Sequence, residues 1–405
     1  MSRKVVITGI GVVSPLGNSP AALWQALSDG QSGLQLLPES MSNGIPTVAG
    51  LCQFDSSQWF SKMQLSGMDR VSQFAVAAAD MALQDAGLAG QDLTEAGIYM
   101  GCGMGGALAI EQAYKAHFET HSRLSPLSVV AGMTNAPAAQ MSMRFKVQGP
   151  VMTYSVACAS SAIAIGEAAR AIARGDIDLA FAGGAEALLG SGVIHAWQAM
   201  HTLAKPDPDH PEASCKAFSS ERSGLVLAEG AAVLMLEEAS AAIARGTTIY
   251  AELAGFGISA DASHLTKPDA SGQQRALKAA LKSANLAPAD IQYCNTHGTA
   301  THVGDEVEAQ ALSSLFGTTL FASSTKTLHG HLLGAAGALE AAITALAVHH
   351  RQMPPGIAHL PQDPKCPLQL VTEHNRGQLP APTHAISNSF AFGGTNAVLV
   401  FSQYA

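Results

Sequence analysis

Two kinds of segment alternate along this chain of 405 residues. Short runs rich in β-branched residues are followed by longer, alanine-rich stretches whose apolar positions recur with helical spacing. This alternation predicts an α/β fold in which parallel strands are covered on both faces. The predicted strands are Lys4–Thr8, Ile98–Gly101, Leu179–Ala182, Ala231–Glu237, Ile291–Asn295 and Ala397–Phe401, and the predicted helices are Val71–Ala86, Ser160–Arg174, Gly272–Ala284, Asp305–Leu315 and Ala335–His350.

The second half of the pattern faintly repeats the first. Each half opens with a strand that runs into a glycine-containing turn, VVITGIGVVSPLG in the first and IYAELAGFGIS in the second. Each half also closes with a β-rich stretch. The sequence therefore predicts a duplicated α/β unit, with one half at residues 1–245 and the other at 246–405.

Composition narrows the function classes. Only 13% of residues are charged and 47% are hydrophobic, which excludes a disordered chain. The net charge of −9 argues against nucleic-acid binding. The six cysteines form no CxxC pair, so we expect free thiols in a reducing cytoplasm. Glycines and Pro15 interrupt the apolar start, and the long uncharged stretches contain Pro, Gly, Ser and Thr, so neither a signal peptide nor a membrane span is expected.

One cysteine stands where chemistry is expected. Cys158 lies in the segment TYSVACASSAIAIGEAARAIARG, between a predicted strand and a predicted helix. A thiol at a helix N-terminus is stabilised as the thiolate, which makes it a better nucleophile. The alternative is a buried structural cysteine, which is the commoner fate of this residue in apolar surroundings.

Three further segments gather polar residues in apolar surroundings, and two of them follow predicted strands or precede helices, where α/β sheets place their sites. They are NTHGTATHVGD from Asn295, STKTLHGH from Ser324 and SNSFAFGGTN from Ser387. A metal site at His297, His302 and Asp305, or at His329 and His331, is one alternative. Another is dinucleotide binding, because Gly101–Gly106 satisfies GxGxxG and Glu119 follows.

Taken together, VACASS, NTHGTAT, STKTLHGH and SNSFAFGGTN resemble the β-ketoacyl-[acyl carrier protein] synthases, in the elongating branch with a Cys-His-His triad. The resemblance covers essentially the whole chain. It implies a thiolase-like fold, with two βαβαβαββ halves in a five-layered α-β-α-β-α core. It also implies a homodimer and an acyl carrier protein as partner. The phosphopantetheine arm of that carrier would enter as substrate, with no bound cofactor.

The same resemblance implies roles for individual residues. Cys158 takes the acyl chain as a thioester, and backbone N–H groups of Cys158 and Phe392 hold the oxyanion. His297 and His331 donate hydrogen bonds to the enolate that forms when malonyl carrier protein loses CO2. Lys326 orders the site electrostatically, and Glu308 is its acidic companion.

Other residues match substrate-binding positions. Thr299 and Thr301 correspond to residues that hydrogen-bond the phosphopantetheine arm, and Phe392 to a gate over the acyl pocket. The remaining matches are Met104, Phe390 and Gly393 for substrate binding, and Asn295, Glu340, Ser387 and Asn388 for a structural cation seen in some relatives.

Some positions depart from the family pattern and leave the pathway open. Ala391 replaces a glycine before the gate and should stiffen that loop, and His302 and His329 replace a proline and a threonine. A specialised polyketide or polyene pathway is therefore an alternative to fatty acid synthesis, in which the chain would pair with a chain-length partner. Non-catalytic partners of that kind typically lack the cysteine, and thiolases usually carry a second cysteine near the C-terminal glycine motif, which is absent here.

Overall fold

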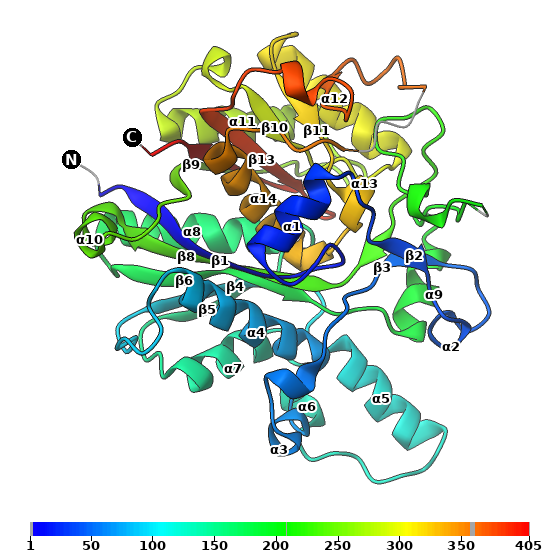
Figure 1. Ribbon diagram of the computed structural model, residues 1–405. Helices are drawn as coiled ribbons and strands as arrows, with labels where there is room; N and C mark the ends of the chain where they lie inside the picture. The colour runs from blue at the N-terminus through cyan, green and yellow to red at the C-terminus, as the bar shows by residue number, and fades with distance from the viewer. Residues whose placement is uncertain (1–2, 208, 357–360, 405) are drawn as a thin grey trace.

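The computed structural model describes residues 3–207, 209–356 and 361–404. Their main sheet has the strand order β12-β11-β10-β13-β14-β9-β1-β8-β6-β4-β5, and a small sheet has the order β2-β3-β7 (Figure 1). The strands are β1 (Val5–Val13), β2 (Leu34–Leu36), β3 (Val48–Gly50), β4 (Gly97–Gly101), β5 (Val151–Tyr154), β6 (Leu179–Glu186), β7 (Leu227–Ala228), β8 (Gly230–Glu238), β9 (Ala251–Ala260), β10 (Tyr293–Asn295), β11 (Phe321–Ser323), β12 (Gln369–Leu370), β13 (His384–Phe390) and β14 (Thr395–Ser402).

The main sheet consists of two runs of strands with the same topology. In β5-β4-β6-β8-β1, the first two pairings are parallel and the next two antiparallel, and β11-β10-β13-β14-β9 repeats this pattern in the same chain order. The two runs join where β1 and β9 pair antiparallel. The expected duplicated α/β unit is therefore confirmed, and the division of the chain at residue 245 stays a prediction.

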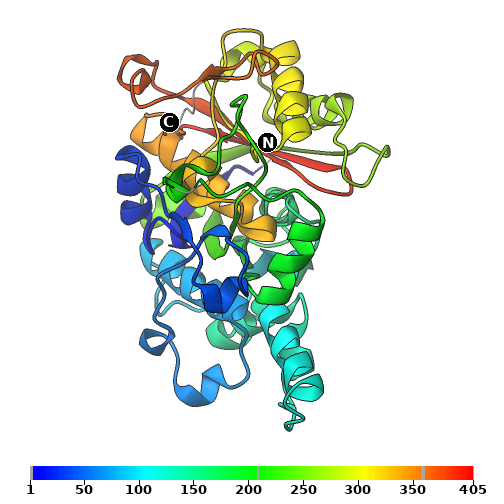
Figure 2. The same cartoon turned by 90° about the vertical axis from the view of Figure 1, so that its right-hand side faces the viewer.

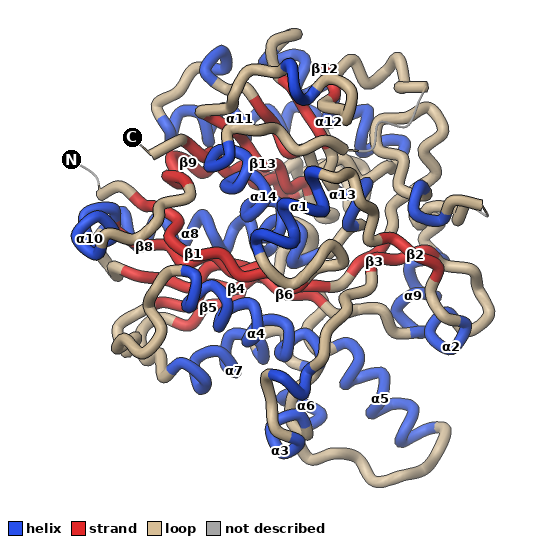
Figure 3. The backbone as a smooth tube through the Cα atoms, in the orientation of Figure 1, coloured by secondary structure: helices blue, strands red, loops and turns tan. Residues whose placement is uncertain are grey.

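The helices cover both faces of each run. They are α1 (Pro20–Ser28), α2 (Glu39–Ser42), α3 (Lys62–Leu65), α4 (Arg70–Asp85), α5 (Ala107–Phe118), α6 (Ser128–Gly132), α7 (Ala136–Phe145), α8 (Ser160–Arg174), α9 (Ser191–Ala199), α10 (Ala239–Arg245), α11 (Ala270–Ala284), α12 (His302–Phe316), α13 (Lys326–His329) and α14 (Ala336–His350). Helices α4 and α7 lie outside one run and α11 and α12 outside the other, while α8 and α14 pack together between them (Figures 1 and 3). These are the five layers that the resemblance implies.

Helix α14 lies in the apolar centre of the molecule. All its residues from Ala336 to Val348 are buried, and most are alanine, leucine or isoleucine. A helix that is apolar on every side is stable only inside a larger body. Helix α5, in contrast, extends away from the rest of the molecule in both views (Figures 1 and 2). No helix in the described part of the chain has the length and apolar character that a membrane span needs.

One local prediction was wrong for a physical reason. The strand predicted at Lys4–Thr8 continues to Val13, so Gly9 and Gly11 lie within β1 and form no turn. A Cβ atom at either glycine would overlap the backbone of α4, and Gly255 and Gly257 in β9 stand in the same relation to α11. The glycines therefore permit close helix packing on the first strand of each half.

Candidate active site

The backbone bends sharply at Cys158. Strand β5 ends at Tyr154, Ala157 has a φ of +45°, and α8 begins at Ser160. A positive φ is strained for alanine. The Ser160 hydroxyl holds the bend, because its Oγ accepts from Val156 N at 2.9 Å and donates to Ala157 O at 2.6 Å. The bend points the Cys158 side chain away from β5, toward the residues of the other half.

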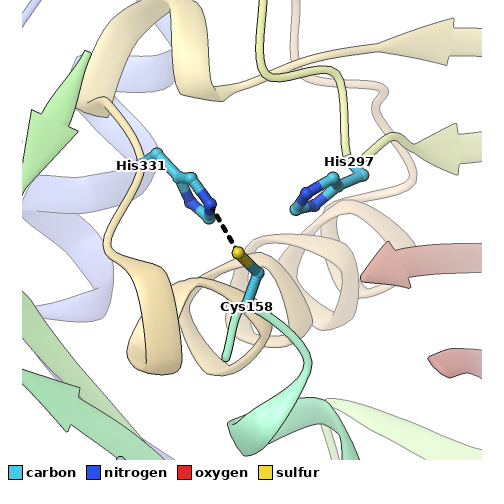
Figure 4. Close-up of side chains that lie close together, drawn as sticks. All are labelled: Cys158, His297 and His331. Carbon is cyan, nitrogen blue, oxygen red and sulfur yellow. Dashed lines mark hydrogen bonds between the residues drawn. The ribbon is translucent and has the colours of Figure 1, made fainter. Parts of the chain in front are cut away.

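Two histidines from the second half face Cys158 (Figure 4). His331 Nε2 lies 3.1 Å from Cys158 Sγ, and its backbone N–H donates to Val226 O at 2.7 Å. The His297 ring stands at 85° to that of His331, with centroids 5.3 Å apart. The structure thus brings together the three residues that the motifs singled out.

The electrostatics of the thiol differ from the sequence-based expectation. Burial raises the pKa of the Cys158 thiol to about 11, and this effect outweighs the opposing influence of Lys326 and of the backbone N–H groups of Phe392 and Cys158. The expectation of a stabilised thiolate is therefore wrong for the resting protein, because Cys158 is buried, at 5% exposed. The thiol keeps its proton at neutral pH and needs a base within hydrogen-bond distance, which His331 provides.

Lys326 acts on the histidines from a fully buried position. Its ammonium group is ion-paired with Glu340 on α14. Burial, followed by the positive charge of Lys326, holds the pKa of both His297 and His331 well below the usual value. Both imidazoles are therefore neutral, and each can accept a proton or donate one N–H.

Glu308 has a different role from the one expected. Lys326 forms its ion pair with Glu340, whereas Glu308 accepts from the backbone N–H groups of His297 at 2.8 Å and Gly298 at 2.7 Å. Glu308 also accepts from Asn388 Nδ2 at 3.0 Å. Burial raises the pKa of Glu308, and these hydrogen bonds and the charge of Lys326 oppose that rise. Glu308 thus fixes the turn that carries His297.

A cavity of about 270 Å³, here called the Cys158 cavity, opens above the sulfur. Four of the predicted substrate-binding or gating residues line it, namely Thr299, Thr301, Phe390 and Phe392. Two do not: Gly393 lies in the adjoining turn with a φ of +87°, and Met104 is 41% exposed.

Other residues that line the Cys158 cavity were not predicted from the sequence. Trp197 stacks on Phe392 with ring centroids 6.1 Å apart, and Gln273 and the segment 264–268 also line the cavity. Helical periodicity predicted α11 but gave no sign that Gln273 faces a cavity. An isolated tryptophan in a short helix likewise carries no motif.

The residues expected to hold a cation supply buried oxygen atoms. Asn295 and Ser387 are register partners on β10 and β13. Ser387 Oγ, Asn388 Oδ1 and Glu340 Oε2 are buried without a hydrogen-bond partner among the described residues. Such oxygens suit a hard cation, so these residues fit the expected structural cation. The Nδ2 atom of Asn388 donates a hydrogen bond to Glu308.

The structure argues against the alternatives. In the Gly101–Gly106 turn, the Glu186 carboxylate accepts from Gly103 N at 2.8 Å and Met104 N at 3.0 Å, where a dinucleotide phosphate would have to bind. Glu119 ends α5 and follows no strand. Among the described residues, the three whose ligand atoms lie within 4.8 Å of one another are Cys158, His297 and His331, and not His297, His302 and Asp305. Both ring nitrogens of His329 are engaged, with Gly330 O at 2.7 Å and Thr325 Oγ1 at 3.0 Å, which leaves none for a metal shared with His331.

The fold and this site define a two-half α/β protein in which a buried cysteine lies beside two neutral histidines. Family models match residues 2–242 as the β-ketoacyl synthase N-terminal domain and residues 250–359 as its C-terminal domain. The chain is 39% identical to 3-oxoacyl-[acyl-carrier-protein] synthase 2 of Coxiella burnetii, over 99% of each chain. The protein belongs to the β-ketoacyl synthase family and is an acyltransferase.

Two solved structures extend this comparison, and each covers 100% of both chains. The ishigamide ketosynthase/chain length factor aligns with a TM-score of 0.92 and 30% identity. A type II polyketide synthase ketosynthase, solved with its acyl carrier protein and bound to the hexaketide, aligns with a TM-score of 0.90 and 28% identity. The predicted family and fold are thereby confirmed.

Proposed function

We propose that the protein catalyses decarboxylative condensation of an acyl thioester with malonyl-[acyl carrier protein]. The products are 3-oxoacyl-[acyl carrier protein], CO2 and free carrier protein. The observation that carries this proposal is the contact of His331 Nε2 with Cys158 Sγ at 3.1 Å, with the neutral His297 beside it and the backbone N–H groups of Phe392 and Cys158 near the sulfur.

In the first half-reaction, the acyl chain moves to Cys158. His331 takes the thiol proton as the sulfur attacks the thioester carbonyl of the acyl carrier protein. The oxyanion accepts hydrogen bonds from the N–H groups of Cys158 and Phe392. The intermediate collapses, the carbon–sulfur bond to the carrier breaks, and the carrier leaves as a thiol with the proton returned from His331.

In the second half-reaction, malonyl carrier protein enters and loses CO2. The electron pair of the breaking carbon–carbon bond moves into an enolate, whose oxygen accepts hydrogen bonds from His297 and His331. The carbanion then attacks the acyl thioester carbonyl, and the bond between that carbon and Cys158 Sγ breaks. The sulfur leaves as a thiolate and takes up a proton from water to regenerate the thiol. Because burial, followed by the charge of Lys326, lowers the pKa of both histidines, each serves as a neutral donor.

The phosphopantetheine arm of the carrier is proposed to occupy the Cys158 cavity, with Thr299 and Thr301 on its wall. No bound cofactor is needed, because the arm belongs to the substrate. Buried, free thiols at all six cysteines are consistent with a cytoplasmic enzyme.

The proposed assembly is a homodimer formed at the open edge of the main sheet. Strand β5 ends the sheet, and its Val151 and Met152 are 37% and 46% exposed. Helix α6, which packs on α7, also exposes Val129 and Val130. An unpaired apolar strand is a template for a second copy. Pairing with a chain-length partner is the alternative, which the alignment with a ketosynthase/chain length factor supports.

Mass analysis of the intact protein tests the reaction. We expect an acyl adduct after incubation with acyl carrier protein, and its discharge as a 3-oxo product two carbons longer after addition of malonyl carrier protein. A series of saturated and polyene acyl chains separates fatty acid elongation from a specialised pathway. Absence of an adduct with every chain would contradict the proposal for the homodimer.

A further inference from the structure

The side chain of Gln273 is buried without a complete set of partners. It lies in the first turn of α11, lines the Cys158 cavity and is 1% exposed. Its Oε1 has no hydrogen-bond partner among the described residues. Burying an amide oxygen without a donor is costly, and folded proteins rarely leave one so. An unpaired acceptor on a cavity wall points to a ligand that supplies the donor.

The backbone that carries Gln273 is held firmly in place. Asp269 caps α11 by accepting from Gly272 N at 3.0 Å, and its own N–H donates to Asp261 at 3.0 Å. Asp261 in turn donates its N–H to Gly394 O at 2.8 Å, in the turn that carries Phe392. These hydrogen bonds therefore connect the backbone near Gln273 to the turn that carries Phe392.

A second unpaired oxygen comes from a different part of the chain. Thr202 follows α9 and lines the same cavity, and its Oγ1 is buried without a partner among the described residues. Its backbone oxygen accepts from Leu225 N at 2.8 Å, which fixes its position. Together, a carboxamide and a hydroxyl offer uncharged donors and acceptors, which match an amide better than they match a phosphate or an alkyl chain.

The wall also offers a counterpart for each group of a phosphopantetheine arm. Lys267, on the cavity wall, is exposed to solvent, whereas Gln273 and Cys158 are both buried, at 1% and 5% exposed. The arm carries a phosphate, two amides and the thioester, so the cation, the carboxamide and the thiol would each meet their chemical counterpart.

We infer that Gln273, with Thr202, binds an amide of the pantetheine arm and so determines specificity for carrier-linked substrates. This inference rests on the proposed function. Gln273 Oε1 accepts the amide N–H, and the Thr202 hydroxyl bonds the same or the neighbouring amide. Neither residue touches the reacting atoms, so the interaction affects substrate binding and leaves the chemical steps unchanged.

The test compares two acyl donors that differ only in the arm. The first is an acyl-pantetheine thioester, and the second is the same acyl group on ethanethiol, which has no amide. Acylation of Cys158 is followed by intact mass for the wild type, Gln273→Met and Gln274→Met. Gln274 is the neighbouring, partly buried glutamine of the same helix and serves as the matched control.

For Gln273→Met we expect KM for acyl-pantetheine to rise about tenfold, the effect of one lost hydrogen bond, with kcat unchanged. The ethanethiol donor should react with both proteins equally, and Gln274→Met should match the wild type. Thermal unfolding gives a second readout: the free Gln273→Met protein should be at least as stable as the wild type, because an unpaired acceptor is removed.

Two results would overturn the inference: an unchanged KM for acyl-pantetheine, or an equal loss with both donors together with a lower unfolding temperature. The second pattern would show that Gln273 only supports the fold. Failure of the proposed function looks different, because in that case neither donor acylates Cys158 even in the wild type, and the inference falls with it.

Discussion

The two halves of the main sheet share one topology but carry different chemistry. Cys158 follows β5 and precedes α8, and His331 occupies the equivalent place between β11 and α14. The turn after β4 holds Gly103 and Met104, whereas the equivalent turn after β10 holds His297. Because α8 and α14 pack against each other, both sets of strand ends meet at one point. Duplication thus places the proposed nucleophile in one half and the two histidines proposed to handle protons and the enolate in the other.

The largest effect is predicted for Cys158, whose loss should separate acyl loading from decarboxylation. Cys158→Ala should form no acyl adduct and lose condensation by more than about 10³-fold. Decarboxylation of malonyl carrier protein should persist, because His297 and His331 are intact. Release of CO2 is measured beside intact mass. Loss of CO2 release in a folded Cys158→Ala protein would show that the halves do not act separately.

His297→Ala should produce the converse result. Acyl loading should continue, because His331 is the residue that contacts the sulfur. Condensation should fall by about 10²- to 10⁴-fold, the usual contribution of one proton-transfer or hydrogen-bonding group. Single-turnover loading and steady-state condensation are measured in parallel, with the exposed His374→Ala as control. Equal loss of both activities would contradict the assignment.

The second half also contains the Lys326–Glu340 ion pair, in which both side chains are fully buried. The described residues of the first half form ion pairs with at most one buried partner, such as Arg70–Glu229. Lys326→Ala should destabilise the fold by about 3–5 kcal/mol, because it leaves Glu340 buried and unpaired. Urea unfolding measures the change. The double variant Lys326→Met, Glu340→Leu should recover most of that stability but not activity. Full activity of the double variant would show that the ion pair is dispensable for the chemistry.

The first half contains its own buried carboxyl group, Glu186, which ties Gly103 and Met104 to Gly334 in the other half. Burial raises the pKa of Glu186 to about 7, from an ordinary value of 4.5. The folded protein therefore binds a proton that the unfolded chain releases between these values, and stability falls as pH rises from 4.5 to 7.

Glu186→Gln removes this titration. The free energy of unfolding of the wild type, relative to Glu186→Gln, should decrease between about pH 5 and about pH 8. Denaturant titrations at several pH values measure the difference. A difference that increases with pH would mean that the three backbone N–H groups hold the carboxylate in its charged form.

The smallest effect is expected at Ala391, in the turn after β13. Its N–H donates to Thr395 O at 2.8 Å, and its φ is not positive. Ala391→Gly should therefore cost only about 0.4–1 kcal/mol, through the greater freedom of the unfolded chain. Chemical denaturation measures the loss, and proteolysis of the 391–394 turn reports its mobility. A stabilised variant would show that the alanine is strained.

The local sequence pattern predicted many of the helices and strands, and it also identified Cys158, His297 and His331. The helix Ser160–Arg174 was predicted with its observed bounds, because Gly175 takes the left-handed conformation that ends a helix. The motifs around Cys158, His297 and His331 were found because unusual polar residues cluster there. Residues that act through distant partners were harder to predict, since no local signal shows that Lys326 pairs with Glu340.

Burial explains the remaining differences. The pKa of Cys158 depends on desolvation by several segments, so its position at a helix N-terminus gave the wrong direction. Likewise, the sequence around Gly9 and Gly11 predicted a turn, because only the packing of α4 against β1 shows why glycine is needed within the strand. Gln273 has helical spacing like its neighbours, and only the packing of α11 places it on the cavity wall.

The most direct measurement is the intact mass of wild-type and Cys158→Ala protein after incubation with acyl carrier protein, followed by malonyl carrier protein. A single acyl adduct on the wild type alone, discharged as a 3-oxo product two carbons longer, is the predicted result. An adduct that persists on Cys158→Ala, or one that malonyl carrier protein does not discharge, would contradict Cys158 as the nucleophile of a condensing site built from both halves.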